Sequence, residues 1–113
     1  MHEMALCESI LETLREQARL GDFTRVERVC LEIGQLAGVE IEALRFGFDV
    51  VMRGSLAENA RLDIVECPAE AWCIQCSTTV PIKERFDACG LCGSHQLQIT
   101  RGTELRIKEL EVN

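Results

Sequence analysis

Four cysteines in the second half of the chain have the spacing of a metal site. Cys73 and Cys76 form one C-x2-C pair, and Cys89 and Cys92 form another, with twelve residues between the pairs. A pair at this spacing sits on a tight turn that points both sulfurs the same way, so two facing pairs surround one ion with four thiolates. This donor set predicts one Zn2+ ion. Two disulfides or free thiols are the alternatives. Disulfides are disfavoured in a chain without an export signal, because they are rare where thiols are kept reduced.

The predicted zinc site is structural. Protein fills all four positions, which leaves no open place for an activated water. The polar segment between the pairs is too short for a core of its own, so the metal is expected to supply much of its stability. His95 is the one nearby group that could replace a cysteine, although a loop histidine without a role is the simpler interpretation.

A second candidate metal site lies at the N-terminus, which reads M-H-E. Residue 2 is bulky, so we expect the initiator methionine to be retained. The Met1 amine, the amide and imidazole of His2, and the amide or side chain of Glu3 can then chelate one ion. Planar or tetragonal nitrogen and oxygen sets favour Ni2+ or Cu2+. On chemistry alone this signal is weak, because many chains carry an early histidine with no role.

Composition excludes several classes of function. The chain has 113 residues and a formal charge of -7, from 19 acidic and 12 basic side chains. Nucleic-acid binding depends on basic side chains that neutralise phosphates, so this charge argues against it and against an anionic membrane surface. No stretch approaches the roughly 18 apolar residues of a membrane span. The N-terminus lacks the pattern of a signal peptide, and we expect a cytoplasmic protein.

The apolar periodicity predicts two helices and three main strands. Three- and four-residue steps favour helices from about Glu3 to Leu20 and from about Glu40 to Arg53. Alternating patterns favour strands near residues 25–34, 61–67 and 103–112. In the first of these strands, Val29, Leu31 and Ile33 share one face, opposite Cys30.

These elements predict an α+β fold. We expect a small mixed three-stranded sheet covered by two helices, because the strand-helix-strand order favours some parallel pairing. A four-cysteine zinc-ribbon-like domain is inserted before the last strand. The expected domains are 1–69 plus 103–113, and 70–102.

The three other cysteines, Cys7, Cys30 and Cys67, are expected to be buried as small apolar side chains. A catalytic thiolate would need a nearby histidine, and the chain has only His2 and His95. The sequence also lacks a phosphate-binding glycine loop, an H-E-x-x-H motif and a paired-carboxylate signature. We therefore predict no enzymatic activity.

Several motifs together resemble the HypA/HybF family of nickel metallochaperones for [NiFe]-hydrogenase maturation. They are M-H-E-M-A-L-C, V-C-L-E-I-G-Q-L-A-G-V-E, A-W-C-I-Q-C with C-G-L-C-G-S, and the closing L-R-I-K-E-L-E-V. The resemblance runs the whole length of the chain. It implies that His2 ligates nickel with the help of Met1 and Glu3, and that the four paired cysteines hold a structural zinc ion. The implied donor-side partner is a HypB-type GTPase, and the implied acceptor is the hydrogenase large subunit precursor.

Two other functions compete with this one. The first is a zinc-ribbon interaction module of the transcription or translation machinery, which the acidic charge disfavours as a nucleic-acid binder but not as a protein binder. The second is a thiol redox protein that uses Cys7, Cys30 or Cys67. Nickel titration separates metal delivery from both.

Overall fold

The computed structural model describes residues 2–113, so Met1 lies outside the described residues. The chain forms two compact units. Of the described residues, the first unit contains 2–31, Val39–Ile64 and Ile107–Asn113, and the second contains Glu32–Gly38 and Val65–Arg106. Within residues 2–113, no helix is long and apolar enough to cross a membrane.

Two helices build the first unit, close to where the sequence predicted them. Helix α1 spans Glu3–Gly21, and α2 spans Ile41–Met52. Each buries a stripe of residues at three- and four-residue steps, which is the period of one helix face. The buried residues are Cys7, Ile10, Leu11 and Leu14 on α1, and Leu44, Gly47, Phe48 and Met52 on α2. The two helices pack against each other along these stripes.

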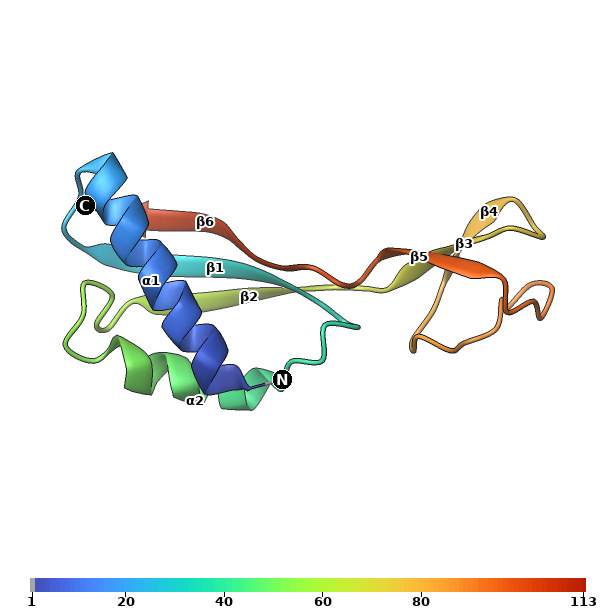
Figure 1. The fold of residues 1–113 in the computed structure, drawn as a ribbon, viewed down its shortest axis with the longest axis horizontal. Helices are drawn as coiled ribbons and strands as arrows, with labels where there is room; N and C mark the ends of the chain where they lie inside the picture. Colours follow the sequence, from blue (N-terminus) through green and yellow to red (C-terminus); the bar gives the residue numbers. More distant parts are fainter. Residues whose placement is uncertain (1) are drawn as a thin grey trace. The chain divides into compact units, whose positions relative to one another are not determined.

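A three-stranded sheet lies beneath the helices, in the order β2-β1-β6. Strand β1 spans Val26–Gly34, β2 spans Arg61–Cys67 and β6 spans Leu105–Val112. In Figure 1, β1 and β2 run in the same direction and β6 runs in the opposite one, as in the predicted mixed sheet. Helix α2 connects the two parallel strands. The predicted α+β fold with two helices over a small sheet is confirmed.

The burial of β1 differs from a simple alternation. Val29, Leu31 and Ile33 are buried as predicted, but Cys30 on the opposite face is only 2% exposed. On that face Arg28 contacts the Asp63 carboxylate through Nε at 2.5 Å and Glu109 through Nη1 at 3.1 Å. Ion pairs from β1 to β2 and β6 therefore help to cover the face of the sheet that lies opposite the helices.

The second unit contains a sheet that the sequence did not predict. Strand β3 spans Glu70–Cys73, β4 spans Thr78–Pro81 and β5 spans Leu97–Arg101. Both β4 and β5 pair antiparallel with β3. The apolar core beside this sheet is small: Ala69, Ala71 and Ile82, with Leu36, Leu97 and Ile99 packed against it.

Two glycines allow the backbone segments of this unit to approach closely. A Cβ atom on Gly34 would lie 2.1 Å from the backbone of Gly102. Gly102 has a φ of +109°, and a Cβ there would lie 2.7 Å from Ala69. Leu36 donates its backbone N–H to the Gly102 carbonyl at 2.7 Å. Larger residues cannot occupy these two positions without moving backbone.

Candidate metal centre

The two cysteine pairs adopt the same local backbone. Cys73 ends β3, and its carbonyl accepts a hydrogen bond from the Ser77 N–H at 2.8 Å. The Cys89 carbonyl accepts in the same way from the Gly93 N–H, also at 2.8 Å. Ser77 and Gly93 both have a positive φ, of 53° and 76°. The residue after each pair thus closes the turn that points two sulfurs toward one place.

The four sulfurs gather into a single cluster, as the spacing predicted. All lie within 4.8 Å of one another, with 3.7 Å between the sulfurs of Cys73 and Cys92 and 4.0 Å between those of Cys76 and Cys89. A tetrahedral zinc site with Zn–S bonds of ~2.3 Å places its sulfurs about 3.8 Å apart. The cluster therefore suits Zn2+ without rearrangement.

Backbone N–H groups stabilise negative charge on these sulfurs. The Cys76 N–H donates to the sulfur of Cys73, and the Leu91 N–H donates to the sulfur of Cys89, each at 3.4 Å. Donation from the backbone N–H groups of Cys92 and Leu91 lowers the pKa of Cys89 to about 7. Contact with the sulfur of Cys92 and burial raise the pKa of Cys76 to about 12. Backbone donation therefore favours the thiolate form of Cys89, which is the form that binds a metal ion.

All four ligand positions of this cluster are supplied by cysteine. Among residues 2–113, the group that could hold a metal contains the four paired cysteines and no histidine. His95 lies on the exposed loop before β5. Four sulfurs around one ion leave no position for an activated water, which is the pattern of a structural site.

The candidate nickel residue His2 lies immediately before α1. It is exposed, its backbone is extended, and its carbonyl accepts the Leu6 N–H at 3.1 Å. Its side chain makes no capping hydrogen bond to the helix. The imidazole is therefore not committed to capping α1. The predicted ligand Met1 lies outside the described residues.

Glu3, the third residue of the motif, makes a contact that the sequence did not predict. Its Oε2 accepts a hydrogen bond from the backbone N–H of Glu40 at 3.1 Å. This bond lowers the pKa of the Glu3 carboxyl. The sequence could not predict this hydrogen bond, because Glu3 and Glu40 are 37 positions apart and lie at the starts of different helices.

The structure gives no support to a redox role for the other cysteines. Cys7, Cys30 and Cys67 are 0%, 2% and 5% exposed, as predicted for small apolar side chains. Burial raises the pKa of Cys7 to about 11, with smaller contributions from nearby Glu3 and Glu8. A buried thiol with a raised pKa is a poor nucleophile, because the thiolate is the reactive form.

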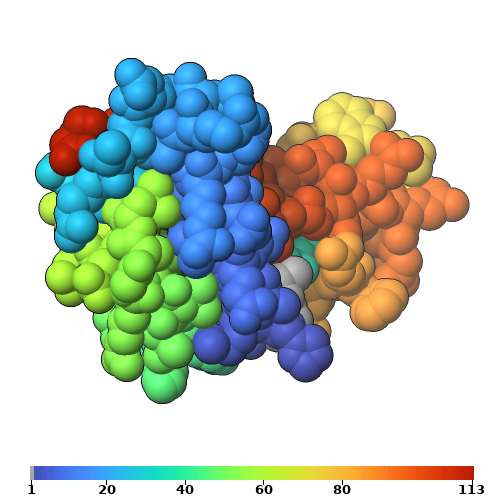
Figure 2. All heavy atoms as spheres, turned by 60° about the vertical axis from the view of Figure 1, so that its left-hand side comes forward, coloured from blue at the N-terminus to red at the C-terminus, as the bar shows by residue number. Residues whose placement is uncertain are grey.

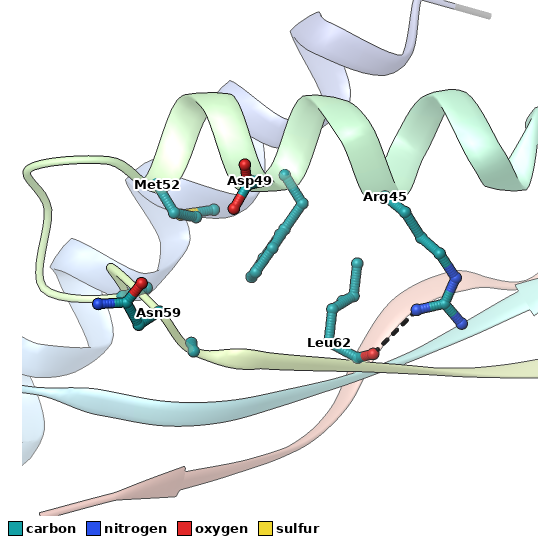
Figure 3. Close-up of a pocket in the computed structure, with 8 residues that line it drawn as sticks. Arg45, Asp49, Met52, Asn59 and Leu62 are labelled. Carbon is teal, nitrogen blue, oxygen red and sulfur yellow. Dashed lines mark hydrogen bonds between the residues drawn. The ribbon is translucent and has the colours of Figure 1, made fainter.

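A shallow cavity of about 170 Å3 lies between α2 and β2, and none of the candidate metal ligands lines it (Figure 3). Arg45, Asp49 and Asn59 contribute its polar groups, and Phe48, Met52 and Leu62 contribute apolar ones. Arg45 is held by its hydrogen bond to the Leu62 carbonyl at 3.1 Å. The lining contains no histidine or cysteine, and the single carboxylate of Asp49 is too small a donor set for a nickel or zinc site.

Comparison with known families decides the assignment. The profile described as "Hydrogenase/urease nickel incorporation, metallochaperone, hypA" matches residues 1–112. The chain belongs to the HypA family. It is therefore a nickel metallochaperone of hydrogenase maturation and not an enzyme, as the sequence predicted.

Curated HypA proteins resemble the chain over its whole length. The hydrogenase maturation factor HypA of Azotobacter vinelandii is 60% identical over 112 residues, which cover 99% of each chain. The HypA of Acidithiobacillus ferrooxidans strain ATCC 53993 is 59% identical, also over 99% of each chain.

Solved HypA structures share the fold. The solution structure of the nickel metallochaperone HypA from Helicobacter pylori is 29% identical and has a TM-score of 0.72. It covers 99% of this chain and 97% of that one. A second solution structure of a HypA protein gives a TM-score of 0.73 at 29% identity, covering 100% of this chain and 97% of that one. The HypA fold is thus retained at low sequence identity.

Proposed function

We propose that the chain binds one nickel ion at its N-terminus through the His2 imidazole and delivers it for assembly of the hydrogenase metal centre. The Met1 amine and Glu3 complete the proposed ligand set. The observation that carries this proposal is the exposed, uncommitted side chain of His2 in a chain of the HypA family. A terminal, solvent-exposed site lets a bound ion pass to a tighter acceptor without any unfolding.

Nickel is the cargo in this scheme, and zinc is the resident metal. We propose that Cys73, Cys76, Cys89 and Cys92 hold zinc, because their sulfur separations match a tetrahedral site. When bound, zinc cross-links the two turns and supplies no reaction chemistry. We also propose 1–69 plus 103–113 as the nickel-binding domain and 70–102 as the zinc-binding domain.

Titration of the untagged protein tests the nickel site. We expect His2→Ala to abolish binding of the single nickel ion, because it removes the one imidazole near the terminus. His95→Ala is the matched control, since it removes the only other histidine, and it should bind nickel as the wild type does. Equal nickel binding by His2→Ala and the wild type would contradict the proposal.

The partners are proposed from the resemblance. We expect a HypB-type GTPase on the donor side and the precursor of the hydrogenase large subunit as the acceptor. Reduced thiols around zinc also fit a cytoplasmic setting. The nickel-loaded GTPase should pass its ion to the chain, and the nickel-loaded chain should pass its ion to the precursor. His2→Ala should fail at both steps. Transfer at the same rate without the chain would argue against a delivery role.

A further inference from the structure

We propose that Glu3 is a positioning residue whose carboxylate holds the first turn of α1 on the N-terminus of α2 and so presents His2 to nickel. This inference rests on the proposed nickel site. In this inference the Glu3 carboxylate stabilises the packing of the two helices, and only the Glu3 backbone amide can serve as a nickel ligand.

The first observation is the hydrogen bond between the two helices. Glu40 is the N-cap residue of α2, and its backbone N–H donates to the Glu3 Oε2 at 3.1 Å. The Glu40 side chain in turn accepts from the Glu42 N–H at 3.3 Å. Helix N-termini carry unpaired N–H groups and partial positive charge, so carboxylates are favoured there. Two carboxylates accept backbone hydrogen bonds at this helix start, and one of them, that of Glu3, is supplied by α1.

The second observation is the close packing of α1 and α2 directly behind this bond. A Cβ on Gly47 of α2 would lie 2.9 Å from the Met4 sulfur and 3.3 Å from the Cys7 sulfur. The Cys7 thiol lies 3.6 Å from the Leu44 carbonyl, which accepts from it. Figure 2 shows the start of α1, in dark blue, beside the green atoms of α2. The small residue on α2 thus lets the first two turns of α1 sit directly on that helix.

These contacts determine where His2 lies. His2 precedes Glu3 directly, and its carbonyl accepts the Leu6 N–H in the first turn of α1. Once Glu3 and Cys7 are fixed on α2, the backbone of residue 2 is fixed with them, while its imidazole stays exposed. A terminal chelate that is already ordered loses less conformational entropy on binding an ion. The Glu3 carboxylate therefore favours nickel binding indirectly, because it orders the backbone of His2 before the ion binds.

Three variants separate positioning from direct ligation. Glu3→Ala removes both the acceptor and the charge. Glu3→Gln removes the charge but keeps an amide oxygen that can accept the Glu40 N–H. Glu8→Gln removes one exposed carboxylate from the same helix and serves as the matched control. Each is compared with the wild type by nickel titration, and by hydrogen exchange of the Glu40 amide in the metal-free protein.

We expect Glu3→Ala to weaken nickel binding by about tenfold, the effect of losing one hydrogen bond to a charged group. Its Glu40 amide should exchange faster. Glu3→Gln should stay within about threefold of the wild type and keep the Glu40 amide protected, and Glu8→Gln should change neither quantity. Equal loss of nickel in Glu3→Gln and Glu3→Ala, with the Glu40 amide still protected in Glu3→Gln, would show that the carboxylate is a ligand.

Two further outcomes would overturn the inference. Unchanged exchange of the Glu40 amide in Glu3→Ala would mean that the contact does not hold α1. Unchanged nickel affinity in Glu3→Ala, with faster exchange, would mean that the contact does not serve the site. Because the exchange measurement needs no metal, it tests the contact even if His2→Ala binds nickel and the proposed ligand is wrong.

Discussion

At the scale of single residues, the chemistry of the chain depends on which side chains the fold leaves free. His2 and Glu3 are neighbours in the motif, yet the imidazole is exposed while the carboxylate is bonded to Glu40. Residue type and spacing identified both as candidate ligands. They could not reveal the bond to Glu40, because it depends on how α1 crosses α2.

Arg28 and Asp63 form an ion pair whose contribution should depend on pH. The guanidinium of Arg28 lowers the pKa of the Asp63 carboxyl in the folded state. A lowered folded-state pKa adds stability above the unfolded value of about 4, and this stability is lost as the pH falls through the folded value. Asp63→Asn should therefore destabilise the protein at pH 7 and do so less near pH 3.

Chemical unfolding followed by the helix signal of circular dichroism measures this difference. Release of zinc at low pH is common to both proteins and cancels in the comparison. Asp49→Asn is the control, since its ion pair with Arg53 is exposed and exposed pairs contribute little. A deficit of Asp63→Asn that is the same at both pH values would refute the electrostatic explanation.

Gly34 should be intolerant of any side chain. A Cβ there would lie 2.1 Å from the carbonyl carbon of Gly102 and 2.6 Å from the Thr103 nitrogen, and both are backbone atoms. We expect Gly34→Ala to reduce the free energy of unfolding by about 1–3 kcal/mol, the usual cost of overpacking. Gly90→Ala should be nearly neutral, because no heavy atom beyond its two chain neighbours lies within 4 Å of the added Cβ. Thermal melts of the two variants compare them, and equal melting temperatures would refute the steric argument.

At the scale of elements, long periodic segments were predictable and short ones were not. Both helices and β1, β2 and β6 lie close to their predicted ranges, because each buries an apolar face with a clear period. Strands β3 and β4 have four residues each, which is too short for a period to be recognised. In β6 the half-buried side chains shift from one alternation to the other, because exposed Lys108 and Glu109 both lie between half-buried Ile107 and Leu110.

The four proposed zinc ligands should support the second sheet. Cys73 belongs to β3, and the apolar cluster beside the sulfurs is only Cys73, Val80 and Cys89, with Cys76 and Leu97 against it. We expect Cys73→Ala to lose the bound zinc and the amide dispersion of β3, β4 and β5, while α1 and α2 keep their circular dichroism.

Zinc analysis and the fluorescence of Trp72, the only tryptophan, measure this loss. Cys30→Ala is the matched control. It removes a buried thiol outside the cluster and should keep one zinc per chain. An ordered second sheet in zinc-free Cys73→Ala would show that the small apolar core suffices by itself.

At the scale of the whole molecule, family and cargo were predictable because they depend on short motifs at fixed positions. The M-H-E start and the four paired cysteines are specific in combination, and the HypA profile confirms the family that they predict. The compact units do not follow the order of the chain, because residues 32–38 belong to the same unit as residues 65–106. That arrangement follows from long-range backbone bonds such as Gln35 N–H to the Cys67 carbonyl at 2.9 Å.

The measurement that tests the central claim most directly is the response of the two histidine side chains to nickel in a single sample. Imidazole signals of the untagged, zinc-loaded protein are followed by nuclear magnetic resonance while one equivalent of Ni2+ is added. We expect the His2 signal to shift or broaden in proportion to the nickel added, while the His95 signal stays in place. An unchanged His2 signal, or a response at His95 alone, would contradict nickel binding at the N-terminus.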